Sequence, residues 1–205
     1  MRAAGCPDAA NATKKSRVTS DIRVRLATRQ DIPGLMALAE RYYIGNLDPA
    51  EQANGFLSVL LSEDWFNWAV DTSGVHVATT DDDGVVGFVG TTDPPLDGQA
   101  GSSPIVRSML TLAESLEFNG KPIAQQRYAF RGPVCIDVAA RGRGVYTQFN
   151  EVTAAAYLER YDLAMLFVDV DNPRSLHTST TKLGAESLAV FEVNSRKYHF
   201  LAFNF

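Results

Sequence analysis

One segment restricts the fold more than any other. The run from Ala164 to Val170 is apolar at every position except Asp169. A strand with one face in solvent alternates apolar and polar residues, whereas a strand covered on both faces is apolar almost throughout. The run therefore predicts a sheet with helices on both of its faces.

Strand patterns and helix patterns alternate along the rest of the chain. The period-two segments and apolar runs predict strands, and apolar residues at three- and four-residue spacing predict helices. Strands are expected at residues 22–26, 75–77, 85–89, 127–138, 164–170, 187–193 and 197–203, and helices at 32–43, 50–61, 105–118, 144–160 and 173–182. This order predicts an α/β (α+β) fold in one domain, residues 21–205, with a central mixed, mostly antiparallel sheet.

Composition limits the classes of protein that the chain can belong to. Apolar residues make up 45% of the sequence and charged residues 21%, the balance of a soluble globular protein. The net charge of −5 argues against a dedicated nucleic-acid binder. No stretch approaches about 18 uninterrupted apolar residues, so no membrane contact is expected. Cys6 and Cys135 and the three histidines show no metal-ligand spacing, and no metal is expected.

Residues 1–20 are predicted to form a flexible leader. The leader carries Lys14, Lys15 and Arg17 but lacks the apolar core of a signal peptide. A cytoplasmic protein is therefore expected.

The segment from Val134 to Val145, VCIDVAARGRGV, carries the strongest chemical signal. An expected strand leads through Arg141, Gly142, Arg143 and Gly144 into an expected helix. Glycines allow backbone N–H groups to approach a ligand, and a helix N-terminus and arginines favour anions. The loop lacks the Walker lysine followed by Ser or Thr, which disfavours a nucleotide triphosphatase. An anion-binding loop and a plain surface turn both fit these residues.

In this context the sequence resembles the GNAT superfamily of N-acetyltransferases. Arg141 and Gly144 match the signature loop of that superfamily, whereas Tyr146 stands where the superfamily prefers Gly or Ala. The stretch DNPRSLHTSTTKLG (171–184) is similar to its strand-to-helix segment, with Asn172 and Ser175 in matching places. The stretches ATRQDIPGLMALAE (27–40) and DDDGVVGFVG (81–90) are similar to its first helix and central hairpin. NGFLSV (54–59) together with GPVCID (132–137) is similar to a bacterial branch of it.

The resemblance implies a reaction and a cofactor site. The expected function is acyl-CoA-dependent N-acyl transfer, by direct attack in a ternary complex, from acetyl-CoA to a primary amine of a small molecule or peptide. The pantetheine arm would pair with backbone at Ile136 and Val138, and Asn172 and Ser175 would meet it near the sulfur. The pyrophosphate would rest on backbone amides of the residues from Arg141 to Tyr146, which are Arg141, Gly142, Arg143, Gly144, Val145 and Tyr146.

Catalytic and acceptor residues are less sharply defined. Asp137, a carboxylate in an apolar strand, is a candidate general base, and a salt-bridged or capping residue is its alternative. Ser179, seven residues after Asn172, stands where many members of the superfamily keep a tyrosine acid, although a plain helix serine fits equally. Tyr43, Phe56 and Trp65 are candidates for an aromatic acceptor wall, with core packing as the alternative.

Two other functions compete with the enzyme. One is a non-catalytic coenzyme-A-binding regulatory domain of the same fold. The other is a nucleic-acid-associated modifier, against which the net charge of −5 weighs. The sequence leaves the oligomeric state open, a homodimer included.

Overall fold

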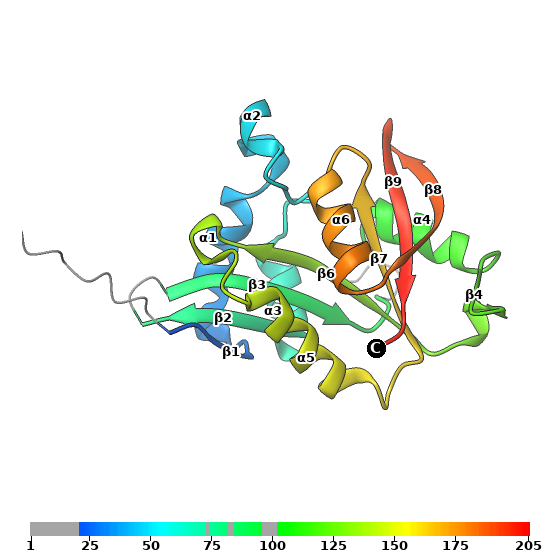
Figure 1. The fold of residues 1–205 in the computed structure, drawn as a ribbon, viewed down its shortest axis with the longest axis horizontal. Helices are drawn as coiled ribbons and strands as arrows, with labels where there is room; N and C mark the ends of the chain where they lie inside the picture. The colour runs from blue at the N-terminus through cyan, green and yellow to red at the C-terminus, as the bar shows by residue number, and fades with distance from the viewer. Residues whose placement is uncertain (1–20, 73, 82–83, 96–101) are drawn as a thin grey trace, which may run out of the picture.

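A computed structural model describes residues 21–205 except 73, 82–83 and 96–101. The leader expected at 1–20 therefore lies outside the described residues. The described chain forms a seven-stranded sheet in the order β1-β2-β3-β6-β7-β9-β8 (Figure 1). All neighbouring strands are antiparallel except β6 and β7, which are parallel, so the predicted mixed, mostly antiparallel sheet is confirmed.

The helices and strands have the following bounds. The sheet contains β1 (Arg23–Leu26), β2 (Val75–Thr80), β3 (Gly84–Thr92), β6 (Tyr128–Ile136), β7 (Leu163–Asp169), β8 (Glu186–Val193) and β9 (Arg196–Phe203). The helices are α1 (Ile32–Arg41), α2 (Pro49–Gln52), α3 (Glu63–Asp71), α4 (Pro104–Ala113), α5 (Val145–Tyr157) and α6 (Pro173–Lys182). A small hairpin, β4 (Glu117–Phe118) with β5 (Lys121–Pro122), stands apart.

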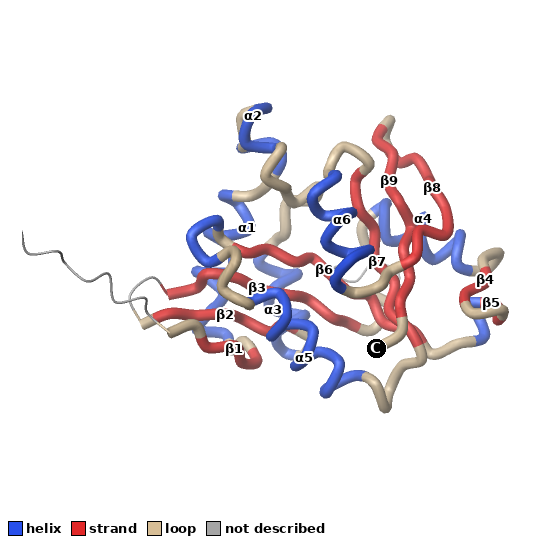
Figure 2. Tube along the Cα trace, viewed as in Figure 1, coloured by secondary structure: helices blue, strands red, loops and turns tan. Residues whose placement is uncertain are grey.

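Helices cover both faces of the sheet (Figures 1 and 2). On one face α1 and α3 pack around Phe66 and Phe88, which are fully buried. On the other face α5 packs Phe149 against β2 and β3, and α6 covers β7. Leu163 and Met165 of β7 pack with Met109 of α4 on the face opposite α6, so the strand predicted from the apolar run at Ala164 is covered on both sides, as its composition requires.

Capping residues stand at two helix starts. Thr28 and Asp31 form a capping box in the short turn that leads into α1. Asn172 caps α6, which spans the predicted residues, with Pro173 in its first turn and Gly184 after its end.

Three predicted elements were wrong at one end or over most of their length. The helix expected at 50–61 exists only as α2, because Gly55 adopts a positive φ of 89° and the chain continues in extended form to pair Leu57 with Tyr43. The helix expected at 105–118 ends at Ala113, and Glu117–Phe118 instead form β4, which turns into β5 at Asn119 and Gly120, both with positive φ. The strand expected to reach Val138 ends at Ile136, as described below.

None of the described helices combines the length and the apolar character that a bilayer crossing requires.

Candidate functional site

The parallel strands β6 and β7 separate along their length. They pair only from Tyr128 with Leu163 to Phe130 with Met165, and then diverge. A cavity of about 830 Å³ lies in the opening, lined by β6 residues 131–136 and β7 residues 166–169. Since the facing edges are no longer paired with each other, they can pair with an extended ligand.

The cavity is cationic although the whole chain has a net charge of −5. The described residues that line it include four basic side chains, which are Arg131, Arg141, Arg174 and Lys182. The one carboxylate in this lining is that of Asp169, which is almost fully buried and ion-paired with Arg196 at 2.6 Å. This charge balance favours an anionic ligand.

The predicted anion-binding loop forms one wall of the cavity. Gly142 and Gly144 have φ of 74° and 80°, which only glycine adopts without strain, and Gly144 caps α5. The first N–H groups of a helix have no partner within the helix, so the start of α5 offers donors and a positive dipole end. A Cβ on Gly144 would meet nothing closer than Gln148 Nε2 at 4.0 Å, which leaves the loop surface open.

Most of the predicted cofactor residues line this cavity. They are Ile136, Arg141, Gly142, Gly144, Val145, Tyr146, Asn172 and Ser175. Arg143 is exposed and lies outside the lining.

Arg141 joins three parts of the site. Its Nε donates to the Ile136 carbonyl at 2.9 Å and its Nη1 to the Asn54 carbonyl at 2.6 Å. Its guanidinium lies over the Tyr42 ring, 5.5 Å from the centroid. Arg141 therefore holds the loop against β6, in addition to contributing positive charge to the cavity.

Val138 was wrongly placed in the strand by the sequence prediction. Its backbone N–H donates to the Tyr42 hydroxyl at 2.9 Å, and the residue begins a single 3₁₀ turn. That donor is therefore occupied within the chain, and Val138 lies outside the cavity lining.

Asp137 adopts the alternative that the sequence left open. One carboxylate oxygen caps the 3₁₀ turn by accepting from Ala139 N at 2.9 Å, and the other pairs with Arg41 Nη1 at 2.7 Å. Asp137 does not belong to the cavity lining. The geometry therefore gives it a local structural role instead of the proposed role as a base.

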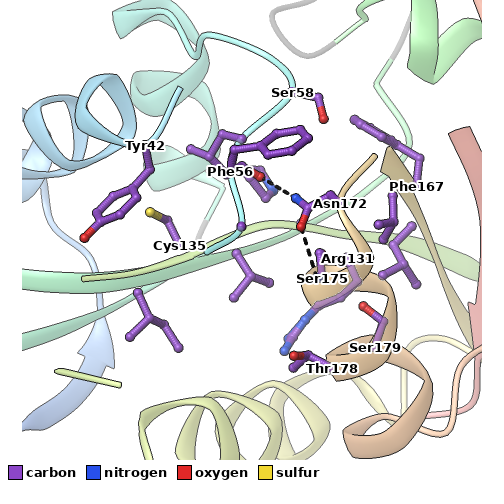
Figure 3. Close-up of a pocket in the computed structure, with 18 of the residues that line it drawn as sticks. Tyr42, Phe56, Ser58, Arg131, Cys135, Phe167, Asn172, Ser175, Thr178 and Ser179 are labelled. Atoms are coloured by element: carbon purple, nitrogen blue, oxygen red, sulfur yellow. Dashed lines mark hydrogen bonds between the residues drawn. The ribbon is translucent and has the colours of Figure 1, made fainter. Parts of the chain in front are cut away.

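Asn172 connects α6 to the loop on the opposite rim. Figure 3 shows its two hydrogen bonds: Nδ2 donates to the Phe56 carbonyl at 2.9 Å, and Oδ1 accepts from Ser175 N at 3.1 Å. Buried and bonded at both ends of its amide, Asn172 fixes the width of the cavity mouth at this point.

Ser179 lies on the cavity wall and is buried. It lies near the phenol of Tyr146, the residue that departs from the GNAT loop pattern. Burial raises the pKa of Tyr146, an effect that the charge of Arg131 and the Ser179 hydroxyl oppose. The bulky Tyr146 thus fills the space between the start of α5 and α6.

The three predicted acceptor residues separate in the structure. Phe56 and Trp65 line the cavity, whereas Tyr43 does not. Its neighbour Tyr42 takes part instead, from the end of α1. Trp65 also contacts Phe66 edge-on in the core, so for Trp65 both the wall and the packing interpretations hold.

Sequence reasoning missed two groups on the cavity wall, Arg131 and Cys135. Cys135 is buried among apolar residues, as its sequence context indicates, and burial raises the pKa of its thiol to about 12. It is therefore protonated at neutral pH and is a poor nucleophile. The available signal for Arg131 was a lone charge within the strand YAFRGPVCI.

No protein-family model matches the sequence, and no curated protein sequence matches it either. Solved structures are similar over nearly the whole chain. A GNAT-family acetyltransferase from Streptococcus agalactiae 2603 has a TM-score of 0.59 and 14% identity, over 90% of this chain and 95% of that one. The ribosomal-protein-alanine N-acetyltransferase from Brucella melitensis has a TM-score of 0.55 and 16% identity, over 89% and 99%. The NatC complex bound to Gag peptide and CoA has a TM-score of 0.59 and 12% identity, over 90% and 99%.

Proposed function

The chain has the GNAT N-acetyltransferase fold, and we propose that it is an acyl-CoA-dependent N-acyltransferase acting on a primary amine. The observation that carries the proposal is the cavity at the β6–β7 split. Its described lining has four basic side chains and one ion-paired carboxylate, beside a glycine loop at the start of α5. Coenzyme A is a polyanion with an extended amide-containing arm, and it complements both features.

In the proposed complex the pyrophosphate rests at the Gly142–Gly144 loop and the start of α5. The arm follows the unpaired edge of β6, where its amides can bond to main-chain groups. The thioester then lies deep in the split, near the point where β6 and β7 begin to pair. The acceptor reaches it from the rim that carries Phe56 and Trp65.

The reaction is direct transfer. The lone pair of a neutral amine attacks the thioester carbonyl, a C–N bond forms and the C–S bond breaks. The amine loses one proton and the departing thiolate gains one. A thiol has an ordinary pKa near 8.5, so the leaving group requires little acid assistance. The high pKa of Cys135 argues against an acyl-cysteine intermediate and for this ternary-complex route.

A non-catalytic coenzyme-A-binding domain is the second candidate, and one observation favours it. The carboxylate in the described lining, that of Asp169, is held by Arg196, and Asp137 lies outside. The cavity lining among the described residues thus offers no carboxylate that is free to act as a base.

Release of free thiol from acetyl-CoA, measured over a panel of primary amines and peptides, tests the enzyme proposal. We expect the wild-type protein to transfer the acetyl group to at least one of these amines. We expect Gly144→Glu to abolish this transfer, because the substitution places bulk and negative charge at the phosphate site. Gly120→Glu is the matched control: Gly120 also has a positive φ, of 70°, and open space around it, but it lies in the β4–β5 turn. Binding of acetyl-CoA without turnover on any amine would favour the non-catalytic domain.

A further inference from the structure

Arg131 is a buried cation of the cavity lining to which the proposed complex assigns no direct ligand contact. It follows Phe130, the last residue of β6 that pairs with β7, and it is 2% exposed. Figure 3 shows its side chain extending from β6 toward Thr178 and Ser179 on α6. Its guanidinium donates to Thr153 Oγ1 at 2.9 Å and to Asn150 Oδ1 at 2.7 Å, both on α5.

No acidic partner compensates this charge within the described chain. None of the ion pairs among the described residues includes Arg131. The groups that interact with it electrostatically are the phenols of Tyr146 and Tyr157 and the imidazole of His76. Burial lowers the pKa of Arg131 to about 10, which leaves it charged at neutral pH.

The hydrogen bonds of the guanidinium are also incomplete. A guanidinium carries five N–H donors, and the buried Nε has no partner among the described residues. An unpaired charge and an unused donor in a buried site are both costly, unless a ligand completes them. Since Arg131 also lines the cavity, a ligand can reach it.

The phosphates of coenzyme A are in the wrong place to be that ligand. The guanidinium of Arg131 bonds to Asn150 and Thr153, which follow Gly144 by six and nine residues, or about 9 and 14 Å along α5 at helix rise. A phosphate bound at the Gly142–Gly144 loop therefore does not contact the guanidinium of Arg131. The anion that Arg131 needs belongs to the far end of the cavity, where the acyl group and the acceptor meet.

We propose that Arg131 is a specificity-determining residue that binds a carboxylate carried by one of the two substrates. The inference rests on the proposed acyl transfer and narrows it. Either the acyl group ends in a carboxylate, as in the coenzyme A thioester of a dicarboxylic acid, or the amine acceptor carries one, as in an amino acid. The carboxylate pairs with the guanidinium, and the hydroxyls of Tyr146 and Ser179 lie beside it on the same wall.

Two arms of one experiment separate the two sources. In the donor arm, succinyl-CoA is compared with butyryl-CoA, which has the same chain length without the carboxylate. In the acceptor arm, acetyl-CoA is used with L-amino acids and with their C-terminal amides. We expect kcat/KM to favour the carboxylate-bearing compound at least tenfold in one arm, and we expect Arg131→Met to bring the ratio of the two kcat/KM values in that arm close to one.

Controls keep the inference distinct from the proposed function. Arg127→Met removes an exposed arginine beside β6 that pairs with Asp162 outside the cavity, and it should keep the preference. Equal use of the paired compounds by the wild-type protein, or a preference that survives Arg131→Met, would overturn the role of Arg131 with the enzyme proposal intact. If Arg131→Met does not fold, equal use of the paired compounds by the wild-type protein still overturns the proposal. If no acyl-CoA binds at all, the proposed function itself fails.

Discussion

Replacing Asp137 with asparagine distinguishes a catalytic role of this carboxylate from a structural one. If Asp137 were the general base, Asp137→Asn would lower the transfer rate about a hundredfold. In the structure its carboxylate lies outside the cavity lining, caps one turn and pairs with Arg41. We therefore expect Asp137→Asn to reduce the transfer rate less than threefold, with an unchanged pH–rate profile.

The expected cost to stability follows from the same contacts. Asparagine can still accept from Ala139 N, so Asp137→Asn loses only the ion pair with Arg41. Since the Arg41 side chain is 65% exposed, this ion pair contributes about 0.5 kcal/mol to the unfolding free energy. Asp137→Ala also loses the cap, for a total of about 1.5 kcal/mol. For a chain of this size that corresponds to a Tm about 5 °C lower.

Thermal unfolding and the thiol-release assay together check this prediction. Asp162→Ala is a matched control, because Asp162 likewise accepts from a backbone N–H, that of Arg127, and pairs with the same arginine away from the cavity. A hundredfold loss of rate in Asp137→Asn, with acetyl-CoA binding intact and the loss shrinking at high pH, would refute the reasoning and restore Asp137 as the base.

Three further predictions concern a buried histidine of β2 and two residues of the cavity wall. Burial lowers the pKa of His76 from 6.5 to about 4, so between these pH values the unfolded chain binds more protons than the folded chain. The contribution of His76 to the unfolding free energy should therefore be complete above about pH 6.5 and fall by up to about 3 kcal/mol toward pH 4. Denaturant unfolding of His76→Phe should not show this fall. Ser179→Ala should cost less than tenfold in transfer rate, because a serine hydroxyl is a weaker acid than the thiol it would protonate; a hundredfold loss with normal donor binding would show that Ser179 organises the proton path. Asn172→Ala should lower the unfolding free energy by about 2 kcal/mol in urea titration, since it removes the α6 cap and leaves the buried Phe56 carbonyl unpaired; a change within error would contradict that account.

The parts of the fold that local signals determine could be predicted from the sequence. Asn172 and Pro173 before α6 and Gly184 after it act within a few residues, and the predicted bounds of this helix were correct. The Asn119–Gly120 turn is a local signal of the same kind, but it was read as the end of a helix instead of as a hairpin. The helix expected at 50–61 fails for a different reason, because the pairing of Leu57 with Tyr43 depends on where α1 ends.

The position of the loop beside the cavity was predictable from the sequence, and the burial of Arg131 was not. Glycines and arginines next to an expected helix start favoured an anion-binding loop and also fitted a surface turn, and the structure places most of that loop on the cavity wall. The burial of Arg131 depends on the divergence of β6 and β7, to which distant parts of the chain contribute. Likewise, Asp137 faces Arg41, which is 96 residues away in the sequence.

The central claim is that the cavity at the β6–β7 split holds a coenzyme A thioester, and direct titration with acetyl-CoA tests it. Calorimetry should show one site per chain, with an affinity that falls as salt rises, because the basic lining attracts the phosphates. The same ligand should raise the Tm of the wild-type protein and of Gly120→Glu, and leave that of Gly144→Glu unchanged. Absence of heat and of any Tm shift in the wild-type protein at millimolar acetyl-CoA would contradict the claim.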